Sequence, residues 1–235
     1  MDSHRTTGHR IIPMASDGWR FVAPLLVLSA LLLVVQFYWA GGFFLLLAFC
    51  VGWFFRDFER KPVKDPGLLL APADGKVGFI DEVDIETPEG EVLRRRRVSI
   101  VLTIFDVHVQ RSPVWGRVRS VVYKPGKFLN AVTNDKSSEE NEHNMIWIDS
   151  QAGPVGVKQI AGLVARRVLC WTRAGETVKM GQRIGLIRFG SRVEAFLPME
   201  AELRVKVGSH VYGATSALAE LPREATRAQK EPADE

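Results

Sequence analysis

Three short segments of this sequence carry side chains that could do acid–base or nucleophilic chemistry. The hydroxyl of Ser191, directly after Gly190, becomes a nucleophile if a base takes its proton. His108 exchanges a proton near neutral pH, and Asp74 could orient a histidine and stabilise its cation. Each segment alone is more typical of a turn or a structural residue. The prediction of a reactive serine with His108 and Asp74 therefore depends on the three together.

Two further residues are candidates for binding. Arg111 could hold a carboxylate or a phosphate, and its alternative is a structural ion pair. His143 could assist at the same site, and its alternative is an ordinary loop residue. Cys50 and Cys170 lie far apart and are not expected to pair. The Cys and His positions show no metal-ligand spacing, so no metal site is predicted.

The elements that must position these residues are expected to be strands. Runs rich in Val and Ile, bounded by Gly, Pro, Asp or Asn, predict a mainly β domain of the sandwich or barrel-sandwich type. The predicted strands cover residues 76–80, 98–104, 116–123, 145–148, 155–160, 163–170, 183–188 and 203–207. Residues 71–78 and 173–187 resemble the opening strand and the glycine turn of lipoyl- and biotinyl-type domains, in which each glycine allows a tight turn.

A long apolar segment precedes this domain. Residues 21–55 contain no charged side chain, and one straight helix of this length would span about 52 Å. A hydrocarbon core is only about 30 Å thick, so we expect a membrane-embedded helical hairpin broken at Gly41-Gly42. Basic residues flank both ends, which places both flanks in the cytoplasm.

The charge balance also favours a membrane. The net charge is +4 and the isoelectric point about 9.2, and beside an apolar segment this indicates an anionic phospholipid surface and not nucleic acid. The cluster at residues 94–97, four arginines, is either a solvated strand end or a contact for lipid phosphates. The expected organisation is a basic flank (1–20), the apolar hairpin (21–55), a basic linker (56–66), a β-rich catalytic domain (67–214) and a disordered tail (215–235).

Taken in order, several segments resemble the short, prokaryotic form of the phosphatidylserine decarboxylase proenzyme family. They are APADGKV (71–77), FDVHV (105–109), NA (130–131), SSEENE (137–142) and GLIRFGSR (185–192). The resemblance implies that the chain cuts itself between Gly190 and Ser191, leaving a large (1–190) and a small (191–235) fragment that stay together, with further oligomerisation left open. It implies that Ser191 becomes a pyruvoyl cofactor, without metal or pyridoxal phosphate.

The same resemblance implies the reaction. Phosphatidylserine in the membrane would form a Schiff base with the pyruvoyl group, lose CO2 and leave as phosphatidylethanolamine. The expected location is the bacterial inner membrane, with the catalytic domain on its cytoplasmic face. Two alternatives stay open: a membrane-anchored barrel-sandwich binding or adaptor module without catalysis, and the same chemistry on another serine-headgroup phospholipid.

One departure from the family pattern concerns the base. Longer relatives have a second histidine three residues after the first, paired with the aspartate for self-cleavage, and Arg111 stands at that position here. His143 stands where close relatives are expected to have an arginine. The residue that activates Ser191 is therefore open: His108 in both steps, or His108 with another group.

Overall fold

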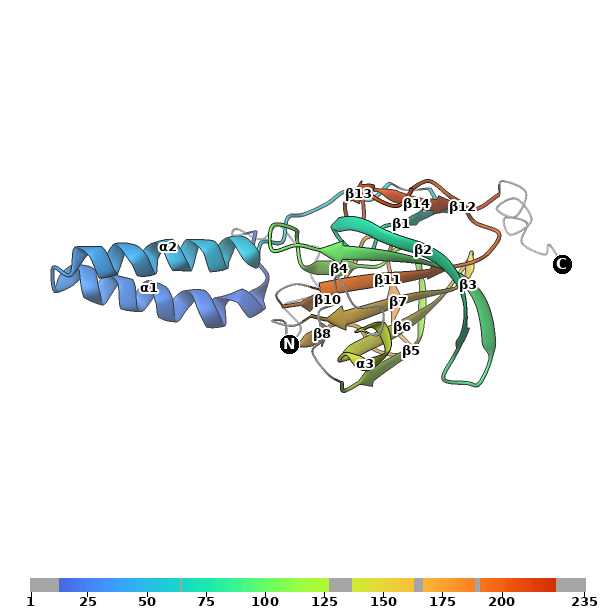
Figure 1. Ribbon diagram of the computed structural model, residues 1–235, viewed down its shortest axis with the longest axis horizontal. Coiled ribbons are helices and arrows are strands. Elements are labelled where there is room, and N and C mark those ends of the chain that lie inside the picture. Colours follow the sequence, from blue (N-terminus) through green and yellow to red (C-terminus); the bar gives the residue numbers. More distant parts are fainter. Residues whose placement is uncertain (1–12, 64, 127–136, 163–166, 189–190, 223–235) are drawn as a thin grey trace. The chain divides into compact units, whose positions relative to one another are not determined.

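The computed structural model describes residues 13–63, 65–126, 137–162, 167–188 and 191–222. The chain divides into two compact units, Met1–Glu59 and Arg60–Glu235. The first is helical and the second is built almost entirely of strands (Figure 1). The predicted class, mainly β with an N-terminal apolar helical segment, is confirmed.

The first unit is an antiparallel helical hairpin. A short 3-10 turn, η1 (Ser16–Gly18), leads into α1 (Trp19–Val34), and α2 (Tyr38–Phe54) returns beside it. The turn lies at residues 35–37, where Gln36 has a left-handed φ of 64°, so the predicted break at Gly41-Gly42 is wrong. Gly41 lies inside α2, and its carbonyl accepts a hydrogen bond from Ser29 Oγ at 2.8 Å.

A Cβ at Gly41 would lie 2.6 Å from Leu33 Cδ2, so any side chain there would displace Leu33. This glycine lets the two helices approach closely, a use of small residues common between apolar helices.

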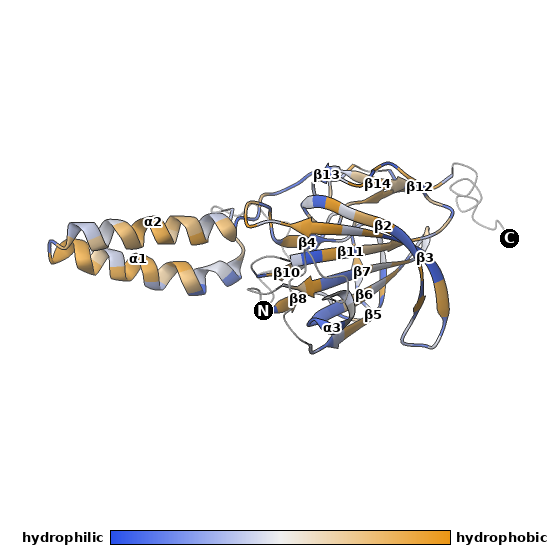
Figure 2. Ribbon diagram, in the orientation of Figure 1, coloured by the Kyte–Doolittle hydropathy of each residue, from blue (hydrophilic) through white to orange (hydrophobic). Residues whose placement is uncertain are grey.

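Both helices are apolar around their circumference (Figure 2). Residues Ser16–Val34 form one helix long and apolar enough to cross a membrane, while α2 is apolar but shorter. Large apolar side chains face outward on both helices; Trp39, for example, is 95% exposed. Water is a poor solvent for such a surface, which is compatible with association of this unit with a membrane.

The second unit contains three antiparallel sheets (Figure 1). The large, curled sheet has the order β13-β2-β3-β11-β7-β6-β5-β9, and two smaller ones have the orders β4-β10-β8 and β1-β14-β12. The strands are β1 (Leu68–Leu70), β2 (Gly75–Glu86), β3 (Val92–Leu102), β4 (Val109–Arg111), β5 (Gly116–Lys124), β6 (His143–Ser150), β7 (Gly153–Ala161), β8 (Val168–Cys170), β9 (Thr177–Val178), β10 (Arg183–Ile187), β11 (Ser191–Leu197), β12 (Glu202–Leu203), β13 (His210–Val211) and β14 (Ala217–Glu220), with a short helix α3 (Ser137–Glu140).

The apolar core lies on the concave, interior face of the large sheet and includes side chains of the two small sheets, such as Leu69 of β1, Ile184 of β10 and Leu218 of β14. The β11 residues Val193 and Ala195 point into it. Alternation along the strand sends Arg192 and Glu194 to the opposite face.

Most of the predicted strands are present, and the glycine turns behave as expected. Gly175 and Gly181 have φ values of 87° and 75°, conformations that residues with a Cβ adopt at a cost. One boundary is wrong: the tail predicted to be disordered from residue 215 contains β14, which pairs with β1 and β12. Leu218 and Ala219 are fully buried there, because residues 217–221 form a short, mostly apolar run that precedes the charged residues of the tail.

The arginine cluster at residues 94–97 belongs to β3 and is largely paired across the strands. Arg94 binds Asp84 and Glu82 of β2, and Arg97 binds Asp81 of β2. These cross-strand ion pairs favour the interpretation of a solvated strand end over that of a lipid contact.

Candidate active site

Ser191 is the first residue of β11 and lies between two strands of the large sheet. It pairs with Leu102 at the end of β3 on one side and with Ala161 at the end of β7 on the other. Its side chain is fully buried, and alternation along β11 directs it to the interior face together with Val193. Within the described part of the chain, the Ser191 hydroxyl has no hydrogen-bond partner. A buried hydroxyl without a partner is costly for stability, so such a group is a candidate for chemistry.

His108 reaches the same edge from the neighbouring small sheet. It directly precedes β4, and its carbonyl accepts a hydrogen bond from the Ile187 amide at the end of β10, at 3.2 Å. Only residues 188–190 separate β10 from β11. The bond to Ile187 therefore joins His108 to the end of the strand that directly precedes β11 in the sequence. The fold therefore bonds the predicted histidine to the segment that leads into the strand of the predicted serine.

The hydrogen bond of the His108 ring identifies its tautomer. The ring is fully buried, and its Nδ1 lies 3.0 Å from the Asp106 carbonyl oxygen. A carbonyl can only accept, so Nδ1 carries the proton and donates it to this bond. In the neutral ring Nε2 then holds a lone pair and can take a proton, as a general base must.

The loop that carries His108 is fixed by Asp106. Its carboxylate accepts hydrogen bonds from the Thr103 amide and from Thr103 Oγ1, both at 2.7 Å. The Asp106 amide returns a bond to the Thr103 carbonyl at 3.0 Å. His210 of β13 lies 3.5 Å from the second carboxylate oxygen. Sequence reasoning treated Asp106 only as part of a motif, whereas the structure shows it as the residue that shapes the loop.

Asp74 lies next to the first residue of β2, across β3 from Ser191. Gly75 there has a φ of 145°, and a Cβ on it would lie 2.3 Å from the Val101 carbonyl oxygen, so this turn requires glycine. Asp74 is buried and accepts two hydrogen bonds from Arg60, at 2.5 and 2.6 Å, and one from the Gly213 amide at 2.8 Å.

These contacts change the role expected for Asp74. Among the described residues, its carboxylate is held by a guanidinium and a backbone amide and not by a histidine. Arg60 also donates to the Gly213 carbonyl at 2.7 Å. This arginine belongs to the segment predicted to be a linker, so residues 56–66 are not simply a connection. No sequence signal distinguishes Arg60 from the other basic residues that follow the apolar segment.

A chain of buried amides supports His108 from the other side. Gln110 Nε2 donates to the His108 carbonyl at 2.8 Å, and Gln159 Nε2 donates to Gln110 Oε1 at 2.8 Å. Asn144 Nδ2 in turn donates to Gln159 Oε1 at 3.0 Å. Gln110 and Gln159 are fully buried and Asn144 nearly so. Sequence reasoning missed this chain, because its members are scattered over β4, β6 and β7 and have no local spacing.

Arg111 is anchored within the protein. Its guanidinium donates to the Gly181 carbonyl at 3.1 Å, and its amide donates to the Pro72 carbonyl at 2.8 Å. The residue is 3% exposed. These contacts favour a structural role over the predicted binding of a substrate carboxylate or phosphate.

His143 faces the other side of the sheet. It pairs with Ile160, which pairs on its other side with Arg192. Arg192 directly follows Ser191, so side chains at the level of Arg192 and His143 point to the face opposite to that of Ser191. Its Nδ1 lies 2.7 Å from the Asn141 carbonyl oxygen. Burial and the nearby Lys158 lower the pKa of His143 to about 4, so it is neutral at physiological pH. Its position does not favour assistance to Ser191.

The same outer face holds a buried charged cluster. Glu194 is fully buried and accepts a hydrogen bond from Ser138 Oγ at 2.9 Å, while guanidinium nitrogens of Arg97 and Arg192 lie 3.8 Å from it. Both arginines also lie over the ring of Phe79, at 4.9 and 5.2 Å. The cluster lies on the outer face of β11, the strand that begins with Ser191.

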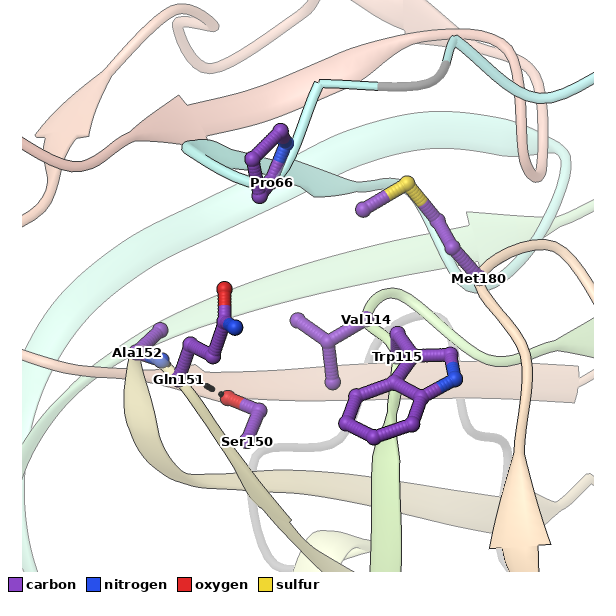
Figure 3. A pocket seen from close by; sticks show the side chains of 7 residues that line it. All are labelled: Pro66, Val114, Trp115, Ser150, Gln151, Ala152 and Met180. Atoms are coloured by element: carbon purple, nitrogen blue, oxygen red, sulfur yellow. Dashed lines mark hydrogen bonds between the residues drawn. The ribbon is translucent and has the colours of Figure 1, made fainter. Parts of the chain in front are cut away.

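A pocket of about 210 Å³ opens at the far end of the large sheet. Figure 3 shows its lining side chains, which are Pro66, Val114, Trp115, Ser150, Gln151, Ala152 and Met180. Ser150 is the last residue of β6, whereas the Ser191 row meets β6 at its first residues. The pocket is therefore not part of the Ser191 site. In the described ranges no group of three or more Cys, His, Asp or Glu side chains is arranged to hold a metal ion.

Comparison with known families gives a match over most of the chain. Residues 47–219 match the family described as "Phosphatidylserine decarboxylase". The match includes every strand of the second unit except the last residue of β14, and with it Asp74, His108, Arg111, His143 and Ser191. It excludes the alternative of a barrel-sandwich binding module without catalysis. Because the matched residues make up most of the sequence, the chain belongs to the phosphatidylserine decarboxylase family and is a carboxy-lyase.

Proposed function

We propose that this chain is a self-processing, pyruvoyl-dependent enzyme that converts phosphatidylserine to phosphatidylethanolamine and CO2. The observation that carries the proposal is the buried Ser191 hydroxyl, which has no described partner, at the edge that also holds His108. Ser191 fits a cofactor made from the chain, because it opens a strand and cleavage before it would leave β11 intact.

Self-cleavage begins with Ser191 Oγ. His108 Nε2 takes the hydroxyl proton, and the oxygen attacks the Gly190 carbonyl carbon, so that the peptide C–N bond breaks and an ester forms. A base then removes the Cα proton of residue 191, the Cβ–O bond breaks, and Gly190 leaves as a carboxylate. The remaining enamine becomes an imine, which water hydrolyses to a ketone with release of ammonia.

The ketone is the pyruvoyl group at the new terminus. It supplies Schiff-base chemistry for the substrate amine and a neighbouring carbonyl that accepts the electrons released with CO2. In this proposal His108, held in one tautomer by the Asp106 carbonyl, returns a proton to the substrate carbon after CO2 has left. We assign both proton transfers to His108, since Arg111 is anchored on Gly181 and His143 faces the opposite side of the sheet.

In this proposal Asp74 and Arg60 are positioning residues that do not contact the reacting atoms. The doubly hydrogen-bonded pair is part-buried and fixes the turn before β2, which lies next to the end of β3. The end of β3 in turn pairs with Ser191. This pair therefore sets the position of the edge at which Ser191 reacts.

The sheet explains how the two fragments would stay together after cleavage. The small fragment would contribute β11, which is hydrogen-bonded along its length to β3 and to β7 of the large fragment. It would also contribute β13, which pairs with β2, and β14, which pairs with β1. Removal of a central strand from a packed core is costly, so the product is expected to be a tight heterodimer.

The substrate and the apolar hairpin support a membrane location. We assign the location to the bacterial inner membrane with the β unit on the cytoplasmic side, because basic residues flank both ends of the apolar segment. The hairpin would hold the chain at the surface where phosphatidylserine lies.

The experiment that tests the activity uses a carbonyl reagent. Purified chain is given phosphatidylserine in detergent micelles, and CO2 release is followed with and without preincubation in hydroxylamine. The proposal predicts release that hydroxylamine abolishes. Release that is insensitive to hydroxylamine would show that no ketone takes part, and absence of release would contradict the assigned substrate.

A further inference from the structure

The loop between β3 and β4 exposes two large apolar side chains. Ile104 is 58% exposed and Phe105 is 74% exposed. They occupy the middle of the turn that Asp106 closes through its three hydrogen bonds with Thr103. The turn is therefore held rigidly in a conformation that presents apolar surface to the surroundings, and exposed apolar surface of this kind often marks an interaction site.

The turn is joined to the candidate active site by direct contacts. Asp106, which follows Phe105, holds His108 Nδ1 through its carbonyl. Its carboxylate lies 3.5 Å from His210, whose ring packs against Tyr212 at 5.0 Å between centroids. Tyr212 is itself 53% exposed. The loop that carries the buried histidine thus contains two exposed apolar side chains, and the exposed Tyr212 adjoins it through His210.

Basic side chains flank this apolar turn. Lys76, which is exposed, pairs in the sheet with His210. The turn at residues 206–209 is bonded to β2 through Gly208, whose amide donates to the Val77 carbonyl at 2.8 Å. This second turn exposes Lys206 and also Val207, which is 58% exposed. Apolar tips beside lysines match the two layers of an anionic membrane surface, the acyl chains and the phosphate headgroups.

We propose that the turn at Ile104 and Phe105 inserts into the boundary between headgroups and acyl chains of the anionic bilayer that carries the substrate. The β unit would then have a lipid-contacting surface of its own, separate from the helical hairpin, that brings a headgroup beside His108. The inference depends on the family's phosphatidylserine substrate and not on the pyruvoyl group. A protein partner at the same turn is the competing outcome, which the experiments below separate.

The first experiment compares two forms of the substrate. Ile104→Ser and Phe105→Ser are prepared in the full chain, with Val92→Ser as the matched control. Val92 is 66% exposed at the opposite end of β3. Rates are measured on phosphatidylserine in anionic vesicles and on dispersed short-chain phosphatidylserine.

Loss of a membrane-inserted Ile or Phe side chain is expected to lower the rate on vesicles at limiting lipid by about ten-fold. The rate on dispersed substrate should stay within about two-fold of the parent, and Val92→Ser should match the parent on both. Equal rates on vesicles, or an equal loss on both substrates, would overturn the proposal. An inactive parent chain would instead contradict the assigned activity.

The second experiment needs no activity. Cys50 and Cys170, the two cysteines of the chain, are replaced by serine, and an environment-sensitive fluorophore is attached through Ile104→Cys or, as control, Val92→Cys. Vesicles of anionic lipid should shift the emission to the blue at position 104 and leave position 92 unchanged. No shift at position 104, or equal shifts at both positions, would refute a specific contact between this turn and the bilayer.

Discussion

The two faces of strand β11 show how one short segment serves two purposes. The interior face carries Ser191, whose hydroxyl has no described partner, followed by Val193 and Ala195 in the apolar core. The outer face carries Arg192 and Glu194 within a buried cluster of charges. Both faces are buried, and the interior one shares its rows with Gln159, whose amide is joined through Gln110 to the His108 carbonyl. Burial of polar groups alone therefore does not identify the reactive face. The reactive face is identified by the acid–base group that the fold connects to it.

The largest expected effect on activity is the difference between replacing two buried serines that lie on opposite faces of the large sheet. Ser191 and Ser99 are both fully buried, and neither hydroxyl has a partner in the described ranges. Ser191→Ala should lose self-cleavage and lower decarboxylation by about 10³-fold or more, since it removes the nucleophile and the precursor of the ketone. Ser99→Ala should cleave and react normally. Gel analysis and CO2 release measure both, and an active Ser191→Ala chain would refute the assignment.

The next effect separates two buried histidines in the same way. His108→Ala should slow cleavage or decarboxylation by about 10²–10⁴-fold, the usual worth of a general acid–base group. His143→Gln, on the outer face, should stay within a few-fold of the parent in both assays. Single-turnover cleavage and steady-state rates provide the test. Comparable losses in the two variants would show that the faces are not functionally distinct.

Two ion pairs, each with a buried carboxylate, offer a comparison in stability. Arg60→Met leaves the Asp74 carboxylate without its guanidinium, and Glu194→Gln weakens the compensation of Arg97 and Arg192. Either change should lower the free energy of unfolding by about 3 kcal/mol, the scale for breaking a buried pair. Only Arg60→Met should also slow cleavage, because its pair fixes the turn beside the end of β3 that pairs with Ser191, whereas Glu194 lies on the outer face of β11. Denaturant unfolding gives the free energies of unfolding. Equally slow cleavage in the Glu194→Gln chain would contradict a specific role of the Arg60–Asp74 pair in cleavage.

The smallest expected effect is a pH dependence on the outer face. Folding lowers the pKa of His143 from 6.5 to about 4. Between these values the unfolded chain binds a proton that the folded chain does not, so stability falls as the pH drops from 6.5 towards 4. The contribution is about 1–3 kcal/mol at 1.36 kcal/mol per pKa unit. Unfolding of His143→Gln should depend less steeply on pH in this window, and identical slopes would contradict the lowered pKa.

Local patterns in the sequence were sufficient for much of the fold. The Val- and Ile-rich runs predicted most strands, and Gly175 and Gly181 take up the left-handed conformations that their turn motif requires. The hairpin turn at Gln36 could not be predicted in the same way. A uniformly apolar run contains no polarity change to mark a turn, and Gly41 turned out to serve helix packing.

The site was predictable in its reactive groups and not in their supports. Ser191 and His108 belong to recognisable local segments, whereas Arg60 reaches Asp74 only through the tertiary fold. The amide chain through Gln110 and Gln159 likewise joins strands that are distant in sequence. The face of His143 depends on the register of β6 and β7, which composition and spacing do not determine.

The central claim is that Ser191 is converted by the chain itself, and the intact mass of the purified protein tests it most directly. The account predicts two species, residues 1–190 and residues 191–235, with the smaller one lighter than its unmodified sequence by one ammonia and blocked at its N-terminus. A single chain of full mass, unchanged on prolonged incubation, would contradict it.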